Sequence, residues 1–406
     1  MNRSSSTKTE ITQQGSVWDR LHKDLVMTVL AHLPEPACLR ARAVCKYWQR
    51  LIDSEEFAAV CGKVWPKMAR PSWFLFYQGM KVETVFVYDP GDESHIYRLP
   101  LTFLPVKKLQ GVCGRAAAGS LLCVEERAKG FFKALYLCDP LEKTWVKLPP
   151  MTIQQQPGEN LDPMRSVILT TAEEEKVSGS YKVFVSSHNR TQVFDSNCSS
   201  WQSLGPAPAV RSSSLMSSVW CDNSLFTLSP PPGFEIVPQR YQLLKFNLDD
   251  PGTGWRPVHV EMPKFLKSPH LAVHRGRIIM VGKVYSRLSS HGPSCHPRMK
   301  IWELNENTAS WDLVDHVPES MHAELISGNW NSACAWNDEW ICIACKDRVL
   351  SYNLRTKRWG KSPQTSMPGS TSSSRSSDPD RPSLSLISSF KPTFRKRCLL
   401  SPKFGE

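Results

Sequence analysis

The sequence lacks the features that mark a membrane, secreted or zinc-binding chain. It contains no run of about eighteen apolar residues, so we expect no transmembrane helix. Residues 1–15 are polar and Ser/Thr-rich with no apolar segment, so we expect a disordered N-terminus, no secretory signal, and a location in the nucleus, the cytoplasm or both. The tightest cysteine spacing is Cys342-x-x-Cys345, no second Cys pair of this kind accompanies it, and the 13 cysteines are therefore expected to be thiols.

Enzyme motifs are also missing. The chain has no G-x-S-x-G sequence, no phosphate loop and no G-x-G-x-x-G sequence. Cys342 and Cys345 are three residues apart in a predicted strand, where an odd separation places the two sulfurs on opposite faces. We therefore predict no catalytic residue, no metal site and no cofactor.

Acidic residues are too few to balance the basic ones. The formal net charge is +12, and the segment 361–406 contributes +5 of it, from eight Lys/Arg against three Asp/Glu. The segment 395–406 is a basic tail containing Arg395, Lys396 and Arg397. Such a cluster could aid nuclear import or touch nucleic acid, but we interpret it as a solvated tail and expect no direct nucleic-acid partner.

Residues 16–64 have the apolar periodicity of helices. Leu21, Leu25 and Val29 recur every four residues, and Pro34 ends this predicted helix. Pro36 begins a short second helix, and the third is marked by Val44, Trp48, Leu51 and Ile52. Three short helices form only a small core, so we expect a partner protein to cover the remaining apolar surface.

These residues resemble the F-box. The resemblance is carried by Trp18–Leu21, Leu25, Leu33–Pro36 and, most specifically, Val44-Cys45-Lys46-Tyr47-Trp48. It implies binding to a Skp-type adaptor and, through it, to a cullin. The residues that it assigns to adaptor contact or its support are Leu21, Leu25, Leu33, Pro34, Val44, Cys45 and Trp48. The chain departs from the family at His22, where proline is usual, and at Ala41, where a larger apolar residue is usual.

A unit of about fifty residues recurs six times after the helices. In each unit a strand ends at an acidic or amide residue, at Asp89, Asp139, Asp195, Asn247, Glu303 and Asn353. An aromatic residue follows six or eight positions later, at Tyr97, Trp145, Trp201, Trp255, Trp311 and Trp359. Four-stranded units in this number predict a six-bladed β-propeller over residues 72–361. Because the acidic and amide residues recur in register, we expect them to bind turn N–H groups and not to catalyse.

The first unit contains only three predicted strands, so its innermost strand has to come from elsewhere in the chain. Residues 362–382 are rich in Ser and Pro and read as a disordered insert. Residues 383–394 regain strand composition. We therefore predict that Leu384–Phe390 crosses back and completes the first blade.

The repeat region is similar to the plant F-box/kelch-repeat family. Met299–Leu304 with Trp311, and Ala134–Pro140 with Leu148–Pro150, carry this similarity, although the doubled glycines of kelch blades are mostly absent. It implies a non-catalytic substrate receptor of an SCF-type ubiquitin ligase. Two alternatives stay open: a propeller scaffold or transcriptional co-regulator that acts without the ligase, and a propeller hydrolase or oxidase.

The loops that join the second and third strands are expected on one face of the propeller. They carry nine cations against five carboxylates, and among the cations are Arg190, Arg240, Arg298 and Arg348. We predict that this face binds an acidic or phosphorylated segment of a protein target, because Arg clusters match carboxylate and phosphate geometry. Solvated loop charge without a partner is the alternative.

Overall fold

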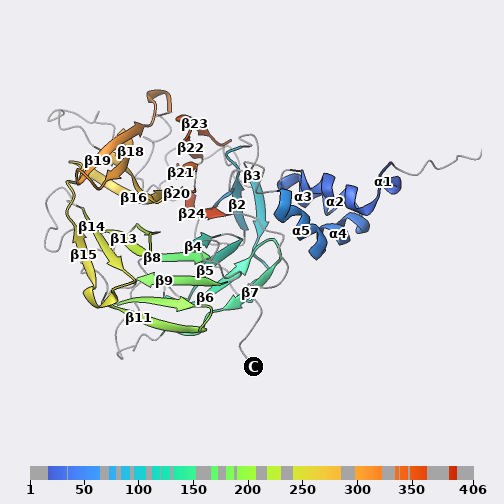
Figure 1. The fold of residues 1–406 in the computed structure, drawn as a ribbon, viewed down its shortest axis with the longest axis horizontal. Coiled ribbons are helices and arrows are strands. Elements are labelled where there is room, and N and C mark those ends of the chain that lie inside the picture. The colour runs from blue at the N-terminus through green and yellow to red at the C-terminus, as the bar shows by residue number, and fades with distance from the viewer. Residues whose placement is uncertain are drawn as a thin grey trace, which may run out of the picture. The chain divides into compact units, whose positions relative to one another are not determined.

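In the computed structural model the chain divides into two units, one built from helices and the other from strands (Figure 1). The structure describes residues 17–33, 35–64, 73–78, 84–91, 96–106, 112–118, 120–128, 131–151, 166–171, 180–186, 190–206, 217–229, 241–284, 298–321, 334–337, 339–345, 348–363 and 384–390. The expectations for residues 1–15, for most of the 362–382 segment and for the 395–406 tail lie outside these ranges.

Among its described residues, the helical unit has five helices where three were predicted. They are α1 (Val17–Arg20), α2 (Lys23–Ala31), α3 (Glu35–Ala41), α4 (Lys46–Ile52) and α5 (Glu55–Val64). The predicted number is wrong at two places. A separate helix, α1, precedes the first predicted one, and Ser54 starts α5, with its Oγ accepting a hydrogen bond from the Phe57 N–H at 3.2 Å. Glu55 and Glu56 then occupy the first turn of α5, where carboxylates are favourable.

One apolar core joins α2, α3, α4 and α5. Its buried members are Val26, Met27, Leu30, Ala31, Cys38, Ala41, Leu51, Ile52, Phe57 and Cys61. On α2 the buried face therefore runs through Val26, Met27 and Leu30. Leu25 and Val29 belong to a different face of the same helix.

The strand unit is a six-bladed β-propeller, which confirms the predicted fold class. Each blade is one four-stranded antiparallel sheet. Blade 1 contains β24 (Leu384–Phe390), β1 (Trp73–Gln78), β2 (Thr84–Tyr88) and β3 (Ile96–Pro100), and blade 2 contains β4 (Val112–Ala118), β5 (Leu121–Ala128), β6 (Phe131–Asp139) and β7 (Thr144–Lys147). Blade 3 contains β8 (Ser166–Thr171), β9 (Tyr181–Ser186), β10 (Arg190–Asp195) and β11 (Ser200–Pro206).

The remaining blades follow the same order. Blade 4 contains β12 (Ser218–Cys221), β13 (Ser224–Ser229), β14 (Gln242–Asn247) and β15 (Trp255–Val258), with the short 3-10 helix η3 (Pro251–Thr253) before β15. Blade 5 contains β16 (Leu266–His274), β17 (Arg277–Val284), β18 (Arg298–Asn305) and β19 (Ser310–His316). Blade 6 contains β20 (Cys334–Trp336), β21 (Trp340–Ala344), β22 (Val349–Asn353) and β23 (Arg358–Lys361).

The six innermost strands close the ring. β24 contacts β4 and β20, β8 contacts β4 and β12, and β16 contacts β12 and β20. β24 pairs with β1 from Trp73↔Phe390 to Gln78↔Leu384, with an irregularity between Leu75 and Phe76. This is the pairing expected from the strand missing in the first unit.

Acidic and amide side chains cap the turns between the third and fourth strands. Asp139 Oδ1 accepts hydrogen bonds from the N–H groups of Leu141 at 2.9 Å and Glu142 at 3.1 Å. Equivalent bonds to the N–H two residues on are made by Asp89, Asp195, Asn247 and Asn353. These carboxylates and amides are thus committed to turn geometry.

In blade 5 the capping residue is Asn305 and not the predicted Glu303. Asn305 Oδ1 accepts from the N–H groups of Asn307 at 3.1 Å and Thr308 at 3.3 Å. Glu303 accepts a hydrogen bond from Arg277 at 2.6 Å instead. Residues two apart share a strand face, so the repeat spacing did not separate these two polar residues.

The repeated tryptophans hold one register in five blades. Each pairs with the residue before the capping residue: Trp145, Trp201, Trp255, Trp311 and Trp359 face Cys138, Phe194, Phe246, Leu304 and Tyr352. In blade 1 that place belongs to Ile96, opposite Tyr88. The predicted Tyr97 is one residue out of register and stacks on Trp73, with ring centroids 6.2 Å apart.

Two indole N–H groups fasten neighbouring blades. Trp201 Nε1 donates to the Pro149 carbonyl of the blade 2 segment at 2.8 Å, and Trp255 Nε1 donates to Thr191 Oγ1 of blade 3 at 3.3 Å. The tryptophans are therefore packing residues, as expected.

Two further expectations fall within blade 6. Cys342 packs in the cluster shared with blade 1 and Cys345 in the cluster shared with blade 5, so the two sulfurs do lie on opposite faces. Ser362, which was assigned to the insert, is buried in the blade, where its N–H donates to the Val349 carbonyl at 2.8 Å.

Candidate functional site

The helical unit carries most of the large apolar side chains that the described part of the chain leaves exposed. Five of these eight side chains lie on it: Trp18 (38% exposed), Leu25 (56%), Val29 (43%), Val44 (65%) and Tyr47 (43%). The other three, Trp145, Phe265 and Leu313, are scattered over the much larger propeller. Exposed apolar side chains gathered on a small unit mark an interaction surface. We call these five side chains the exposed apolar set.

The described residues that were predicted to bind the adaptor are either exposed or half-buried. Leu25 and Val44 are exposed and available for contact. Leu21, Leu33 and Trp48 are half-buried and pack against the helical core, so they support the surface from below. Cys45 is exposed and N-caps α4, with Sγ accepting from the Trp48 N–H at 3.4 Å. Pro34 lies outside the described residues.

Three members of the exposed apolar set were not predicted as site residues. Val29 was predicted only as one position of the apolar stripe, and it lies one turn after Leu25 on the exposed face of α2. Tyr47 lies directly before Trp48, whose ring makes an edge contact with Trp18 at 4.9 Å between centroids. The spacing of four residues between Leu25 and Val29 was the available signal, since it puts both on one face.

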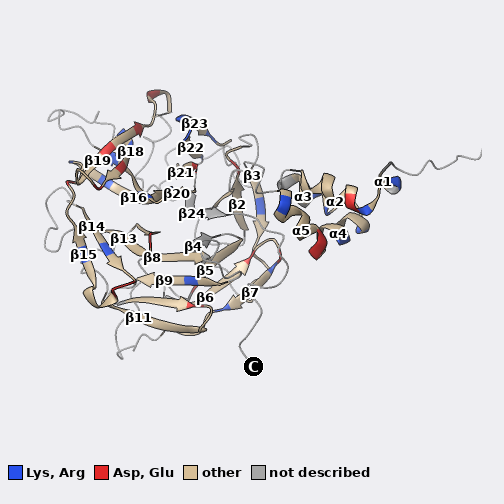
Figure 2. Ribbon diagram, viewed as in Figure 1, with Lys and Arg blue, Asp and Glu red and all other residues tan. Residues whose placement is uncertain are grey.

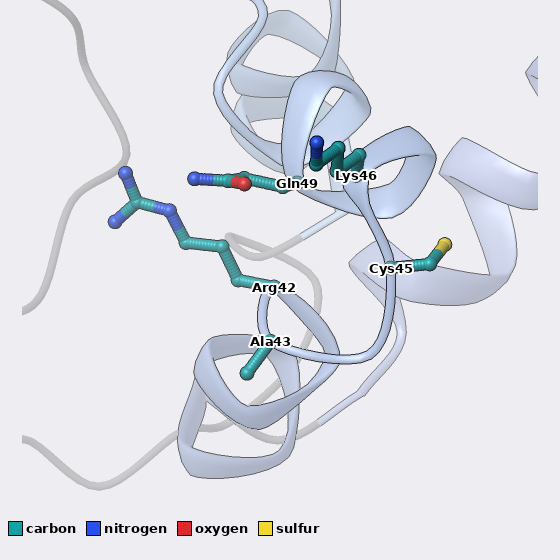
Figure 3. A pocket seen from close by; sticks show the side chains of 5 residues that line it. All are labelled: Arg42, Ala43, Cys45, Lys46 and Gln49. Atoms are coloured by element: carbon teal, nitrogen blue, oxygen red, sulfur yellow. The ribbon is translucent and has the colours of Figure 1, made fainter.

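An open hollow of about 440 Å³ lies at the junction of α3 and α4. It is lined by Arg42, Ala43, Cys45, Lys46 and Gln49, and Figure 3 shows the side chains of Arg42 and Gln49 extending to the same side while the Cys45 sulfur points away. Arg42 Nε is held by Asp53 Oδ1 at 2.7 Å. The sequence neighbours of Val44 and Tyr47 therefore line a hollow that carries cationic and amide side chains.

Residues 18–59 match the family model described as the F-box domain. The helical unit is an F-box domain. The chain is 23% identical to the protein UNUSUAL FLORAL ORGANS of Arabidopsis thaliana over 85% of its own length and 78% of that protein. It is 25% identical to F-box only protein 6 of Arabidopsis thaliana, over 87% of this chain and 71% of the relative. It is also 22% identical to an F-box/kelch-repeat protein of the same plant, over 85% and 81%.

These relatives are similar to the chain across both units, and not only across the F-box. F-box proteins of plants are therefore its homologues. One distant relative among them is named as a kelch-repeat protein.

His22 compensates in part for the proline usual at its place in the F-box. It is the N-cap of α2, with φ −62° and ψ 143°, and its Nδ1 accepts from the Asp24 N–H at 3.4 Å. A proline would adopt the same φ. The entry to α2 thus has the geometry that a proline would impose, supported here by a side-chain cap.

The described propeller residues that were predicted to bind a target belong to different blades. Arg298 is exposed and pairs with Glu319 at 3.2 Å. Arg348 is half-buried, and its carbonyl accepts from the Cys345 N–H at 2.7 Å. Arg190 begins β10 in blade 3, and Arg240 lies outside the described residues. The described ones therefore stand on three different blades.

Neither a metal centre nor a membrane span appears among the residues that the structure describes. No group of three or more His, Cys, Asp or Glu side chains comes together there in a way that could hold a metal ion. Within the same ranges no helix has the length and apolar character to cross a membrane.

Proposed function

We propose that this chain is the substrate-recognition subunit of an SCF-type ubiquitin ligase. In this proposal the F-box binds a Skp-type adaptor, and through it a cullin, while the propeller binds a protein target in the nucleus, the cytoplasm or both. The chain itself is non-catalytic, and the associated ligase transfers ubiquitin.

The exposed apolar set carries this proposal. Leu25, Val29 and Val44 are each more than 40% exposed, although apolar side chains are normally covered. Covering such a side chain contributes roughly 1–2 kcal/mol. An adaptor that covered several of them would gain enough free energy to offset a large part of the cost of association.

Replacing one exposed leucine tests the proposal against a matched control. Leu25→Ala should weaken binding of the full-length chain to purified Skp-type adaptor about tenfold, because about 1.4 kcal/mol corresponds to that change in Kd. Leu313→Ala should leave the Kd unchanged, since Leu313 is equally exposed at 54% but lies on β19 of the propeller. Both side chains are outside the cores, so both variants should fold.

Equal adaptor binding by the parent and by a Leu25→Ala/Val44→Ala double variant would refute the ligase assignment. That result would favour the alternative function, a propeller scaffold or transcriptional co-regulator that acts without the ligase.

For the target, the proposal is an acidic or phosphorylated protein segment held on the face where the second and third strands are joined. The described residues there, Arg190, Arg298 and Arg348, lie at or next to strand ends, and recognition concentrates in loops that a rigid scaffold positions. An Arg190→Glu/Arg348→Glu variant should lose target capture and keep adaptor binding. Unchanged capture would remove this part of the proposal.

A further inference from the structure

Trp145 differs from the other four tryptophans of the repeat. It is 40% exposed, whereas Trp311 is buried and Trp201, Trp255 and Trp359 are half-buried. The indole N–H groups of Trp201, Trp255 and Trp311 donate hydrogen bonds to neighbouring segments at 2.8, 3.3 and 3.2 Å. Among the described residues, Trp145 has no such acceptor. Its ring therefore packs in the blade only in part and leaves an apolar surface open.

The Trp145 ring rests on an ordered support. Its edge contacts Tyr136, with ring centroids 6.0 Å apart and ring planes at 67°. Tyr136 is 5% exposed, and its hydroxyl donates to Glu126 Oε2 at 3.0 Å. Lys133 Nζ donates to the other oxygen of the same carboxylate at 2.5 Å. Because hydrogen bonds already hold these side chains, little conformational entropy is lost when a ligand covers the indole.

The exposed charges around Trp145 are positive. Among the described residues of the hairpin formed by β6 and β7, the exposed charged side chains are Lys133, Lys143 and Lys147, while Glu142 in the turn is half-buried. Lys133 is already neutralised by the pair described above. Lys143 and Lys147 form no ion pair with any residue that the structure describes. Lys147 shares a strand face with Trp145, two residues before it, and Lys143 directly precedes β7.

The strand that carries Trp145 has one open edge. β7 is the outermost strand of blade 2, so one of its edges is not paired with another described strand. An extended segment can add to such an edge through its backbone N–H and C=O groups. Lysines on an edge oppose pairing with a second copy of the same strand and favour a segment of opposite charge. Figure 2 shows the Lys and Arg residues of the outer strands, β7 among them, in blue.

We propose that Lys143 and the open edge of β7 form a docking site for an acidic, extended segment of a partner protein. The segment adds to β7 as a further strand of blade 2. One of its carboxylates faces Lys147, an apolar side chain two residues along covers the Trp145 ring, and a second carboxylate reaches Lys143. This site goes beyond the proposed function, because the outer edge of blade 2 is separate from the strand-joining loops to which the target was assigned.

The test uses the full chain and a fluorescein-labelled peptide, followed by fluorescence anisotropy. The central residues of the peptide are glutamate, threonine, leucine, threonine and glutamate, so that acidic and apolar side chains share one face of a strand. Lys147→Glu should weaken binding at least about tenfold, because a carboxylate then opposes the carboxylate of the ligand. Trp145→Ala should weaken binding as well. The same peptide with methylated backbone nitrogens should bind less tightly, since strand addition needs its N–H groups.

Lys143→Glu has a matched control in Lys357→Glu. Lys357 precedes β23 of blade 6 as Lys143 precedes β7, and the two have φ angles of 57° and 54°, but Trp359 next to β23's first residue is half-buried. Lys143→Glu should therefore weaken peptide binding, and Lys357→Glu should leave it unchanged. If near-ultraviolet circular dichroism shows that Trp145→Ala is unfolded, the two lysine variants of blade 2 decide the question, because both positions are exposed.

The inference is overturned if Lys143→Glu and Lys147→Glu bind the peptide as the parent does, or lose no more affinity than Lys357→Glu. It is also overturned if the methylated peptide binds equally well. A labelled poly-uridine RNA that shows the same dependence on Lys147 would overturn it too, since the site would then take polyanions in general. Adaptor binding, measured on the same variants, should not change, so failure here is distinguishable from failure of the ligase role.

Discussion

Removing the closing strand β24 is the sharpest test of how the propeller holds together. A chain that ends at residue 382 lacks β24, and a chain that ends at residue 390 keeps it, so the two truncations differ by this strand. β24 covers the edge of β1, whose residues Trp73, Phe74, Leu75 and Phe76 are at most 1% exposed. Without β24, part of this aromatic strand faces water.

The expected cost follows from the area uncovered. Exposing roughly 150 Å² of apolar surface, the area of one aromatic side chain, costs about 4 kcal/mol at about 25 cal/mol per Å². In a domain of this size each kcal/mol corresponds to about 2 °C, so the Tm should fall by about 8 °C. This is a substantial part of the 5–15 kcal/mol typical for whole domains, so insoluble protein is an equivalent outcome.

The assay is thermal unfolding followed by near-ultraviolet circular dichroism, which reports the packing of the aromatic residues. The chain ending at residue 390 should melt within about 1 °C of the parent, far less than the shift expected from an aromatic side chain's area. If the chain ending at residue 382 melts with it, β24 does not close the ring and the reasoning fails.

Three further outcomes are expected. Gly282→Ala should destabilise the propeller by about 1–3 kcal/mol in chemical denaturation, because its Cβ would lie 2.7 Å from Leu266 Cδ1 and 3.4 Å from Pro269 Cα, whereas Gly252→Ala has only ordinary contacts and should be nearly neutral. His22→Pro should keep both stability and adaptor Kd, since φ is already −62°; a clear loss of helix content by circular dichroism would contradict this. Lys283→Met should stabilise the protein most near pH 7. The pKa of Lys283 is about 8 in the fold against an ordinary 10.5, so the unfolded chain binds more protons between these values and the parent gains stability as pH rises. The advantage of the variant should therefore shrink as the pH rises from about 8 to 10, and a constant difference would contradict this expectation.

The blade count could be predicted because turn chemistry and tryptophan packing repeat. Each blade needs a polar cap for its outer turn and a large side chain beside it, so an acidic or amide residue and an aromatic residue recur in the sequence. The misassignments arose where two neighbouring residues could each have been the recurring one. Glu303 and Asn305 share a strand face, and Tyr97 stands next to the Ile96 that holds the tryptophan place.

The candidate site in the F-box was predictable only in part. The sequence showed an apolar stripe on α2, but a stripe does not tell which residues face the helix's own core and which face outward. In the structure Val26 and Leu30 are buried in the core, whereas Leu25 and Val29 are exposed.

The closure of blade 1 by β24 has a consequence for shortened versions of this chain. The F-box core uses residues that are close together in sequence, between Val26 and Cys61, while the ring depends on a strand that begins at Leu384. A premature stop codon anywhere between them would leave the F-box core complete and the ring of blades open. On the proposed function, such a product would bind the adaptor without presenting a target, and it would compete with the full-length protein as a dominant negative.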